Sequence, residues 1–310
     1  MFSYSRLRAR CLEQSTDTPS RPDPSDVRHS MTGPALTDSQ KPLVDLIVAA
    51  RPNFMKIAPL YRHLQASRRC VLRLIHTGQH YDEAMSGWFL RDLGLPAPHK
   101  CLSVGSGTHA EQTAGVMVRY EAMCCSERPD WLIVPGDVNS TMACAIAAKK
   151  LGIRVIHLEA GLRSFDRTMP EEINRAITDA ISDVLWTPSP DADENLAREG
   201  IRPEAIVRIG NTMIDSLEWM RPRIEAESAK LPGRSRAVVT LHRPANVDNP
   251  NVLGRLVEIL KIVSCEVPLV FPLHPRTLVR LREADLLGAL ERTAGIDLAR
   301  ISHERAVSGA

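Results

Sequence analysis

The feature that most constrains the fold of this chain is a repeated alternation that begins near residue 42. Short runs of apolar and β-branched residues alternate with longer segments in which apolar residues recur every three or four positions. Strands are expected at 44–50, 71–76, 131–134, 155–157 and 184–187, and helices at 56–66, 81–93, 109–125, 140–150 and 171–181. This alternation is typical of βαβ units that build a parallel sheet. It predicts a doubly wound α/β domain over residues 41–209.

A shorter pattern of the same kind follows. The expected elements are a strand near 206, a helix at 212–227, strands at 237–241 and 268–273, and helices at 251–263 and 275–292. A complete doubly wound domain has about five or six strands, so residues 210–310 are expected to form an incomplete second domain. Residues 1–40 are rich in Ser, Thr, Pro, Arg and Asp and lack hydrophobic periodicity, and they are expected to be a disordered tail.

The net charge and the cysteines exclude several classes of protein. The formal net charge is only +2, so no general basic field favours nucleic acid or a membrane surface. No apolar run of the sequence approaches the length of a membrane span. Seven scattered cysteines, without a C-x-x-C pair or the Cys/His spacing of a zinc site, indicate buried free thiols in a reducing compartment. A cytoplasmic protein without structural metal is therefore expected.

Two short motifs that follow predicted strands could bind an anion. The motif R-P-N-F-M-K, from Arg51 to Lys56, opens the first helix, where backbone N–H groups and the positive helix end attract anions. The alternative is a helix start with solvated basic residues. The motif T-G-Q-H, which ends with Gln79 and His80, follows the second strand, and its two polar residues are site candidates or ordinary polar groups. Neither motif has the glycine spacing of a dinucleotide site or a P-loop.

Three carboxylates fall in separate loops at one predicted edge of the sheet. Asp137 and Glu159 follow two strands, and Glu171 begins the next helix. The carboxyl ends of parallel strands meet at the same edge, where open α/β sheets bind their ligands. Clustered acids push the pKa values of one another apart, so a proton acceptor and a proton donor can coexist at neutral pH. The sequence therefore predicts an acid–base site here.

Two other interpretations apply to these acids. They could form salt bridges with Arg163 and Arg175, and this holds for Glu172 in particular. They could also bind magnesium, although the basic residues of the neighbouring motif favour an acid–base role.

Two histidines follow the strands of the second pattern. His242 lies in the motif T-L-H-R-P, and His274 ends the next strand. A core histidine would be expected inside a strand, whereas one at the strand end can contact or protonate a departing diphosphate. His242 is the stronger candidate.

Taken in order, these motifs resemble the UDP-N-acetylglucosamine 2-epimerase family. The match consists of R-P-N-F-M-K, P-G-D, H-L-E-A-G-L-R, P-E-E-I-N-R and L-H-R-P, and it extends from about residue 44 to about residue 292. The resemblance implies a GT-B-like fold, in which two Rossmann-like domains hold a UDP-sugar in the cleft between them. It also implies a homodimer and a role in polysaccharide biosynthesis.

The resemblance further implies a reaction and roles for the candidates. UDP-N-acetylglucosamine and UDP-N-acetylmannosamine would be interconverted at C2 by elimination and re-addition of UDP, without NAD, metal or another cofactor. Asp137, Glu159 and Glu171 would be the acid/base group, and His242 would help UDP depart. The residues expected to bind substrate are Arg51, Lys56, Gln79, His80, Arg163, Arg175 and His274.

The sequence departs from the family pattern after about residue 295. The family continues into a T-D-S-G-G segment and a T-E-R-P-E-like segment, and residues 296–310 contain neither. The chain therefore resembles a C-terminally truncated member. The alternatives are an inactive truncated member, a hydrolysing 2-epimerase that shares the same residues, and a GT-B glycosyltransferase that shares the fold.

Overall fold

The computed structural model describes residues 40–78, 90–228 and 236–300. Residues 1–39 of the expected tail, most of the expected helix at 81–93, and the candidates Gln79 and His80 lie outside these ranges.

The first sheet contains seven parallel strands in the order β3-β2-β1-β4-β5-β6-β7. Its strands are β1 (Leu43–Val48), β2 (Val71–His76), β3 (Lys100–Cys101), β4 (Trp131–Pro135), β5 (Arg154–Leu158), β6 (Val184–Thr187) and β7 (Ile206–Arg208). The predicted doubly wound α/β fold is confirmed, although the two-residue β3 was too short to predict. The strand order reverses between β1 and β4, and such a switch point is where ligands bind in open α/β sheets.

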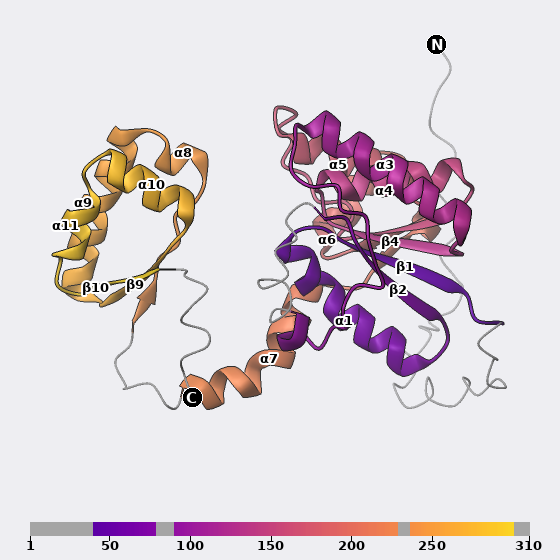
Figure 1. The fold of residues 1–310 in the computed structure, drawn as a ribbon, viewed down its shortest axis with the longest axis horizontal. Coiled ribbons are helices and arrows are strands. Elements are labelled where there is room, and N and C mark those ends of the chain that lie inside the picture. The colour runs from indigo at the N-terminus through magenta and orange to yellow at the C-terminus, as the bar shows by residue number, and fades with distance from the viewer. Residues whose placement is uncertain (1–39, 79–89, 229–235, 301–310) are drawn as a thin grey trace, which may run out of the picture.

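Helices cover both faces of this sheet (Figure 1). They are α1 (Arg51–Ser67), α3 (His109–Ser126), α4 (Asn139–Lys150), α5 (Pro170–Ile181) and α6 (Pro190–Arg198), whereas α7 (Thr212–Ser228) packs on α1. Leu46 of β1 packs in the core under α1, and Ile47 packs in the core under α3 and α4. Successive side chains of a strand point to opposite faces, so β1 has to be apolar at nearly every position.

A small ionic network in the first sheet has a buried centre, Asp45 and Arg73, and an exposed member, Glu127. Arg73 of β2 donates to Asp45 of β1 at 2.6 Å and to Glu127, after α3, at 2.6 Å. The Tyr120 hydroxyl also donates to Asp45, at 2.9 Å. Burial raises the pKa of Asp45, and the bonds from Arg73 and Tyr120 act against that rise. The network lies near the amino ends of the strands, opposite the predicted site.

The described cysteines are free thiols, as expected, but only some are buried. Cys124 and Cys144 are buried, and burial raises the pKa of both thiols. Cys101, Cys125 and Cys265 are exposed. The expectation that these thiols are buried is therefore wrong for those three.

Helix α7 lies against α1, although it follows the expected domain boundary at residue 210. The Ser216 hydroxyl donates to the Met55 carbonyl at 2.6 Å, and the guanidinium of Arg62 lies 4.0 Å from the centre of the Trp219 ring. The boundary itself stays a prediction.

The second sheet contains three parallel strands in the order β10-β9-β8. Its elements are β8 (Ala237–Val238), α8 (Pro244–Val247), α9 (Pro250–Glu266), β9 (Leu269–Leu273), α10 (Pro275–Glu283), α11 (Leu287–Glu291) and β10 (Ile296–Arg300). The single helix expected at 275–292 is wrong. Asp285 adopts a left-handed conformation with φ of 56° and separates α10 from α11. Strand β10 was not predicted.

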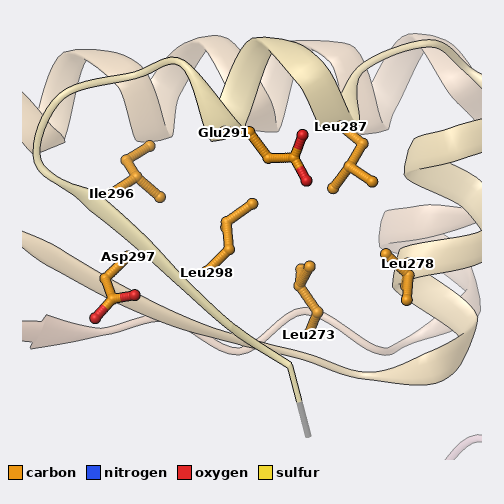
Figure 2. A pocket seen from close by; sticks show the side chains of 7 residues that line it. All are labelled: Leu273, Leu278, Leu287, Glu291, Ile296, Asp297 and Leu298. Atoms are coloured by element: carbon orange, nitrogen blue, oxygen red, sulfur yellow. The ribbon is translucent and has the colours of Figure 1, made fainter. Parts of the chain in front are cut away.

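A cavity of about 290 Å³ lies between β10 and the helices α10 and α11 (Figure 2). Ile296, Asp297 and Leu298 of β10 all line it, and the Asp297 side chain points to the other side of the strand from Ile296 and Leu298, as the alternation of a strand requires (Figure 2). Leu287 and Leu273 complete much of the apolar lining.

Within the described ranges, no helix is long and apolar enough to cross a membrane.

Candidate functional site

The candidate site lies at the carboxyl edge of the first sheet, beside its switch point. Helix α1 begins at Arg51, soon after β1 ends at Val48. Asp137 follows β4, and Glu159 directly follows β5. Because these strands are parallel neighbours, their loops meet at one edge.

An ion pair joins two of the candidates. Lys56 Nζ contacts Glu159 Oε2, and their side chains are 12% and 20% exposed. Gly136 makes this approach possible, since a Cβ atom at that position would lie 2.8 Å from Lys56 Nζ and 3.5 Å from Glu159 Oε2. Gly136 also has φ of 65°, which favours glycine. The pair is thus built around a glycine that precedes Asp137.

Glu159 adopts an uncommon backbone conformation. Its φ is 73°, in the left-handed region that residues other than glycine seldom adopt. The N–H groups of Glu159 and Ala160 both donate to the Trp186 carbonyl at 3.0 Å. Such conformations persist where the surroundings fix them, and they cluster at active sites. The backbone therefore supports a functional role for this carboxylate.

Asp137 is held from two sides by α5. Arg175 forms an ion pair with Asp137 and a second one, at 2.7 Å, with Glu172. Asn174 Nδ2 donates to the Asp137 carbonyl at 2.9 Å. Asn174 lies inside the motif P-E-E-I-N-R, but nothing in that local pattern predicts this contact. One turn of α5 thus orients both the backbone and the side chain of Asp137.

Glu172 has a structural role, as one of the interpretations of the sequence proposed. Its carboxylate accepts hydrogen bonds from the N–H and hydroxyl of Ser164 and from the N–H of Phe165, each at 3.0 Å. Burial acts to raise its pKa, but the bonds from Ser164, Arg175 and Phe165 prevail and lower the pKa to about 2. Glu172 therefore holds the loop before α5 and is fully ionised at neutral pH.

Asn53 connects the first helix to the site. Its side-chain oxygen accepts the N–H of Ala50 at 3.0 Å, and its Nδ2 donates to the Pro135 carbonyl at 3.4 Å. The side chain therefore ties the start of α1 to the end of β4. The motif R-P-N-F-M-K does not predict this role of Asn53, because a partner 82 residues away is not visible in a local pattern.

A buried histidine, His76, ends β2 and directly precedes the second predicted motif. His76 Nδ1 accepts the N–H of Gly78 at 2.9 Å, and its ring stacks on Phe54 with centroids 5.6 Å apart. Burial lowers the pKa of His76 to about 4. His76 is therefore neutral at pH 7, and it links the end of β2 to α1.

The buried neutral His76 should make stability depend on pH. Its pKa is lower in the folded chain, about 4, than the ordinary 6.5 of an unfolded one, so the unfolded chain binds the proton first. The contribution of His76 is complete above pH 6.5 and is lost as the pH falls toward 4. The free energy of unfolding should be about 2 kcal/mol lower at pH 5 than at pH 7 from this group alone.

Urea unfolding of the wild type and of His76→Gln at several pH values tests this expectation. At pH 8 the side chain at position 76 is uncharged in both proteins, so the difference between their free energies of unfolding measures the packing lost in the variant. That difference should shrink by about 2 kcal/mol at pH 5. Parallel curves for the two proteins between pH 4 and 7 would contradict the expectation.

The other candidates of the first sheet differ in their surroundings. Glu171 is half-buried in the first turn of α5, and Arg51 is the exposed first residue of α1. Arg163 is only 3% exposed and pairs with Asp179 and with Glu199, each at 2.7 Å. The geometry favours a structural role for Arg163, and its contact with substrate stays a prediction.

The two histidine candidates lie together in the second sheet. The centroids of the His242 and His274 rings are 5.8 Å apart. His274 directly follows β9, but β8 ends at Val238 and not at the expected residue 241, so His242 lies in the loop after that strand. His274 Nδ1 also accepts the N–H of Arg276 at 3.2 Å and caps α10. Within the described residues the structure therefore brings the two histidines to each other, and their contact with a substrate held at the first sheet stays a prediction.

The arrangement at the first sheet can move protons beside an anion. Asp137 and Glu159 each have a cationic partner, Arg175 and Lys56 respectively. The same cations lie beside the start of α1, whose backbone N–H groups suit a phosphate. Among the described residues, no group of three or more His, Cys, Asp or Glu side chains is arranged to hold a metal ion.

Comparison with known proteins places this geometry in context. The family model described as UDP-N-acetylglucosamine 2-epimerase matches residues 62–301. The chain is 39% identical over 258 residues to the UDP-N-acetylglucosamine 2-epimerase of Methanococcus maripaludis, covering 80% of this chain and 69% of that one. It is 40% identical over 234 residues to the UDP-2,3-diacetamido-2,3-dideoxy-D-glucuronate 2-epimerase of Pseudomonas aeruginosa, covering 74% and 66%.

A solved structure agrees with these matches. The crystal structure of the Methanocaldococcus jannaschii UDP-GlcNAc 2-epimerase in complex with UDP-GlcNAc and UDP superposes with a TM-score of 0.73 and 39% identity. The alignment covers 83% of this chain and 73% of that one. The fold is GT-B-like, as the motifs predicted.

Proposed function

This chain belongs to the UDP-N-acetylglucosamine 2-epimerase family, and on that premise we propose that it interconverts UDP-N-acetylglucosamine and UDP-N-acetylmannosamine. The observation that carries the proposal is the pairing of Glu159 with Lys56 and of Asp137 with Arg175 at the switch point of the sheet. Carboxylates supply the proton transfers of an epimerisation, and the adjacent cations suit a diphosphate.

The proposed reaction is an elimination followed by a re-addition. The C2–H bond of the sugar has no adjacent carbonyl, so simple deprotonation would be difficult. A carboxylate takes the C2 proton while the C1–O bond breaks, and the electron pair of that bond leaves with UDP. The intermediate is 2-acetamidoglucal. UDP then adds back to C1, and an acid protonates C2 from the opposite face.

We propose roles for the residues on this basis. Asp137, Glu159 and Glu171 form the acid/base group, without an assignment of each to one face of the sugar. Arg51, Lys56 and Arg175 stabilise the charge that grows on the departing diphosphate, as preorganised cations do in a transition state. His242 assists the departure of UDP. Gln79, His80 and His274 remain proposed contacts to substrate.

Isotope exchange tests the proposed function directly. The full chain is incubated with UDP-N-acetylglucosamine in deuterated water, and the products are followed by NMR and mass spectrometry. We expect deuterium at C2 and formation of UDP-N-acetylmannosamine. Absence of both label and product would contradict the proposal. Release of UDP with free N-acetylmannosamine would indicate a hydrolysing enzyme, and glycosylation of an added saccharide without C2 exchange would indicate a glycosyltransferase.

The identity to the Pseudomonas aeruginosa relative supports a second candidate substrate. That relative is named for UDP-2,3-diacetamido-2,3-dideoxy-D-glucuronate, and its 40% identity equals that of the Methanocaldococcus jannaschii UDP-N-acetylglucosamine 2-epimerase. Both sugars carry a 2-acetamido group and UDP, so the same C2 chemistry applies to both. Comparison of kcat/KM for the two nucleotide sugars distinguishes the candidates, and we expect UDP-N-acetylglucosamine to be preferred.

The organisation of the chain belongs to the same proposal. We propose a tail over 1–40, a first domain over 41–209 and a second over 210–310, with UDP-sugar in the cleft between the domains. A cytoplasmic homodimer that serves polysaccharide biosynthesis fits this chemistry. Light scattering coupled to size-exclusion chromatography would test the dimer, for which we expect twice the chain mass of 34.3 kDa.

A further inference from the structure

A buried aspartate of α5 binds both sides of the Glu159 loop. Asp179 is fully buried, and its carboxylate contacts His157 Nδ1 at 2.6 Å and the Arg163 guanidinium at 2.7 Å. It also accepts the N–H of Gly161 at 3.1 Å. All three partners lie in the segment from His157 to Arg163. One carboxylate therefore anchors the whole loop that carries Glu159.

The positions of these anchors matter because Glu159 lies midway between them. His157 and Gly161 are two residues before and after it, and both are bound to the same carboxylate. Between them, Glu159 keeps its left-handed backbone. A conformation of that kind is unfavourable by about 1–2 kcal/mol for a residue with a Cβ atom, so it depends on the fixed flanks.

The same histidine also reaches the Asp137 loop. His157 Nε2 donates to the Gly136 carbonyl at 2.8 Å, because a carbonyl oxygen can only accept. Gly136 immediately precedes Asp137. The His157 ring is fully buried and thus connects Asp179 to the loops of both carboxylates.

We propose that Asp179 and His157 form a positioning pair that sets the geometry of Asp137 and Glu159, an inference that rests on the proposed function. Both side chains are fully buried, so they act through the loops and not on the sugar. Burial acts to raise the pKa of Asp179, but His157 and Arg163 prevail and lower it, which keeps the anchor ionised. A displacement of about 1 Å in a reacting group can lower the rate about 100-fold.

Asp179→Asn, compared with Asp183→Asn, tests the proposal. Asp183 also holds β5, since it accepts Lys149 Nζ at 2.8 Å and the N–H of Val155 at 2.7 Å, but Val155 lies at the opposite end of the strand from the carboxylates. Asp183→Asn therefore also removes a charged side chain that holds β5, but it leaves the contacts of the loops that carry Asp137 and Glu159 unchanged. Two quantities are measured in the full chain: kcat for C2 exchange, and the exchange rates of the amides of residues 159–161.

We expect Asp179→Asn to lower kcat about 100-fold with a much smaller change in KM, and to speed amide exchange at 159–161 at least about tenfold. Asp183→Asn should leave kcat within about threefold. The proposal is overturned if Asp179→Asn keeps both kcat and amide protection, or if the two variants lower kcat equally. If the wild type shows no C2 exchange, the proposed function fails, and amide protection alone decides the positioning role.

Variants of His157 keep the test decisive if Asp179→Asn does not fold. In His157→Gln the side-chain amide can reach the Gly136 carbonyl in place of Nε2, whereas His157→Ala has no donor. We expect the kcat of His157→Gln to be at least about tenfold above that of His157→Ala. If the enzyme shows no turnover, we expect the amides of residues 136–137 to exchange more slowly in His157→Gln than in His157→Ala. Equal values for the two variants would overturn the link through His157.

Discussion

Replacement of Glu159 by glutamine is expected to lower the turnover of UDP-N-acetylglucosamine by about 10²–10⁴-fold. The glutamine keeps the shape of the side chain but cannot accept or release the C2 proton. The paired Lys56 would remain in place, so binding of the diphosphate should change little. The loss should therefore appear in kcat, as for an interaction made in the transition state. Deuterium incorporation at C2 and formation of product measure it.

The matched control is Glu127→Gln. Glu127 is also a glutamate paired with a cation, Arg73 at 2.6 Å, but it lies near the opposite edge of the sheet and its side chain is 62% exposed. Its turnover should stay within about threefold of the wild type. Circular dichroism and thermal unfolding would establish that both variants are folded. If Glu159→Gln retained more than about a tenth of wild-type turnover, Glu159 would not be an acid or base of the reaction.

Replacement of Gly161 by alanine is expected to destabilise the first domain by about 3 kcal/mol or more. Gly161 has φ of 80°, and its added Cβ atom would lie 2.4 Å from the Ala192 carbonyl oxygen and 2.9 Å from the carbonyl carbon. These are backbone atoms at the start of α6, so no side-chain rotation can relieve the clash. The helix would have to move away from the loop that carries Glu159. Urea unfolding measures the change in the free energy of unfolding.

Gly200→Ala separates the two contributions to this effect. Gly200 has φ of 83°, yet no atom lies within 4 Å of its ideal Cβ position. The backbone strain should be alike in the two variants, about 1–2 kcal/mol. Gly161→Ala should exceed Gly200→Ala by about 2 kcal/mol. Equal losses in the two variants would show that the approach of Ala192 does not constrain this loop.

Local patterns were sufficient to predict most of the first sheet, though not β3. Strands β1, β2, β4, β5 and β6 lie within one or two residues of their expected positions, and so do the helices α3, α4 and α5. The reason is that parallel strands covered on both faces are nearly continuous apolar runs, which contrast strongly with amphipathic helices. The same contrast between apolar runs and amphipathic segments predicts where each strand ends. Since Asp137 and Glu159 follow strand ends, it also predicts that they lie at one edge of the sheet.

The second sheet was harder to predict because its elements depend on weaker local signals. The break between α10 and α11 rests on Asp285, which has a left-handed conformation that no residue pattern required. Strand β10 is recognisable only through its pairing with β9, for example Leu298 with Phe271. The spacing of apolar residues along the chain predicts neither of these two features.

The sequence alone determined the α/β class, the carboxyl-edge loops and the residue types of the site, because each of these depends on local order along the chain. Only the tertiary structure decided which charges meet. It paired Glu159 with Lys56 and placed Glu172 and Arg163 in structural contacts. It also revealed Asp179, 22 residues after His157, as a common anchor of the loop. Such partners are chosen by the packing of α5 against β5, where a buried charge must find the nearest opposite charge or donor.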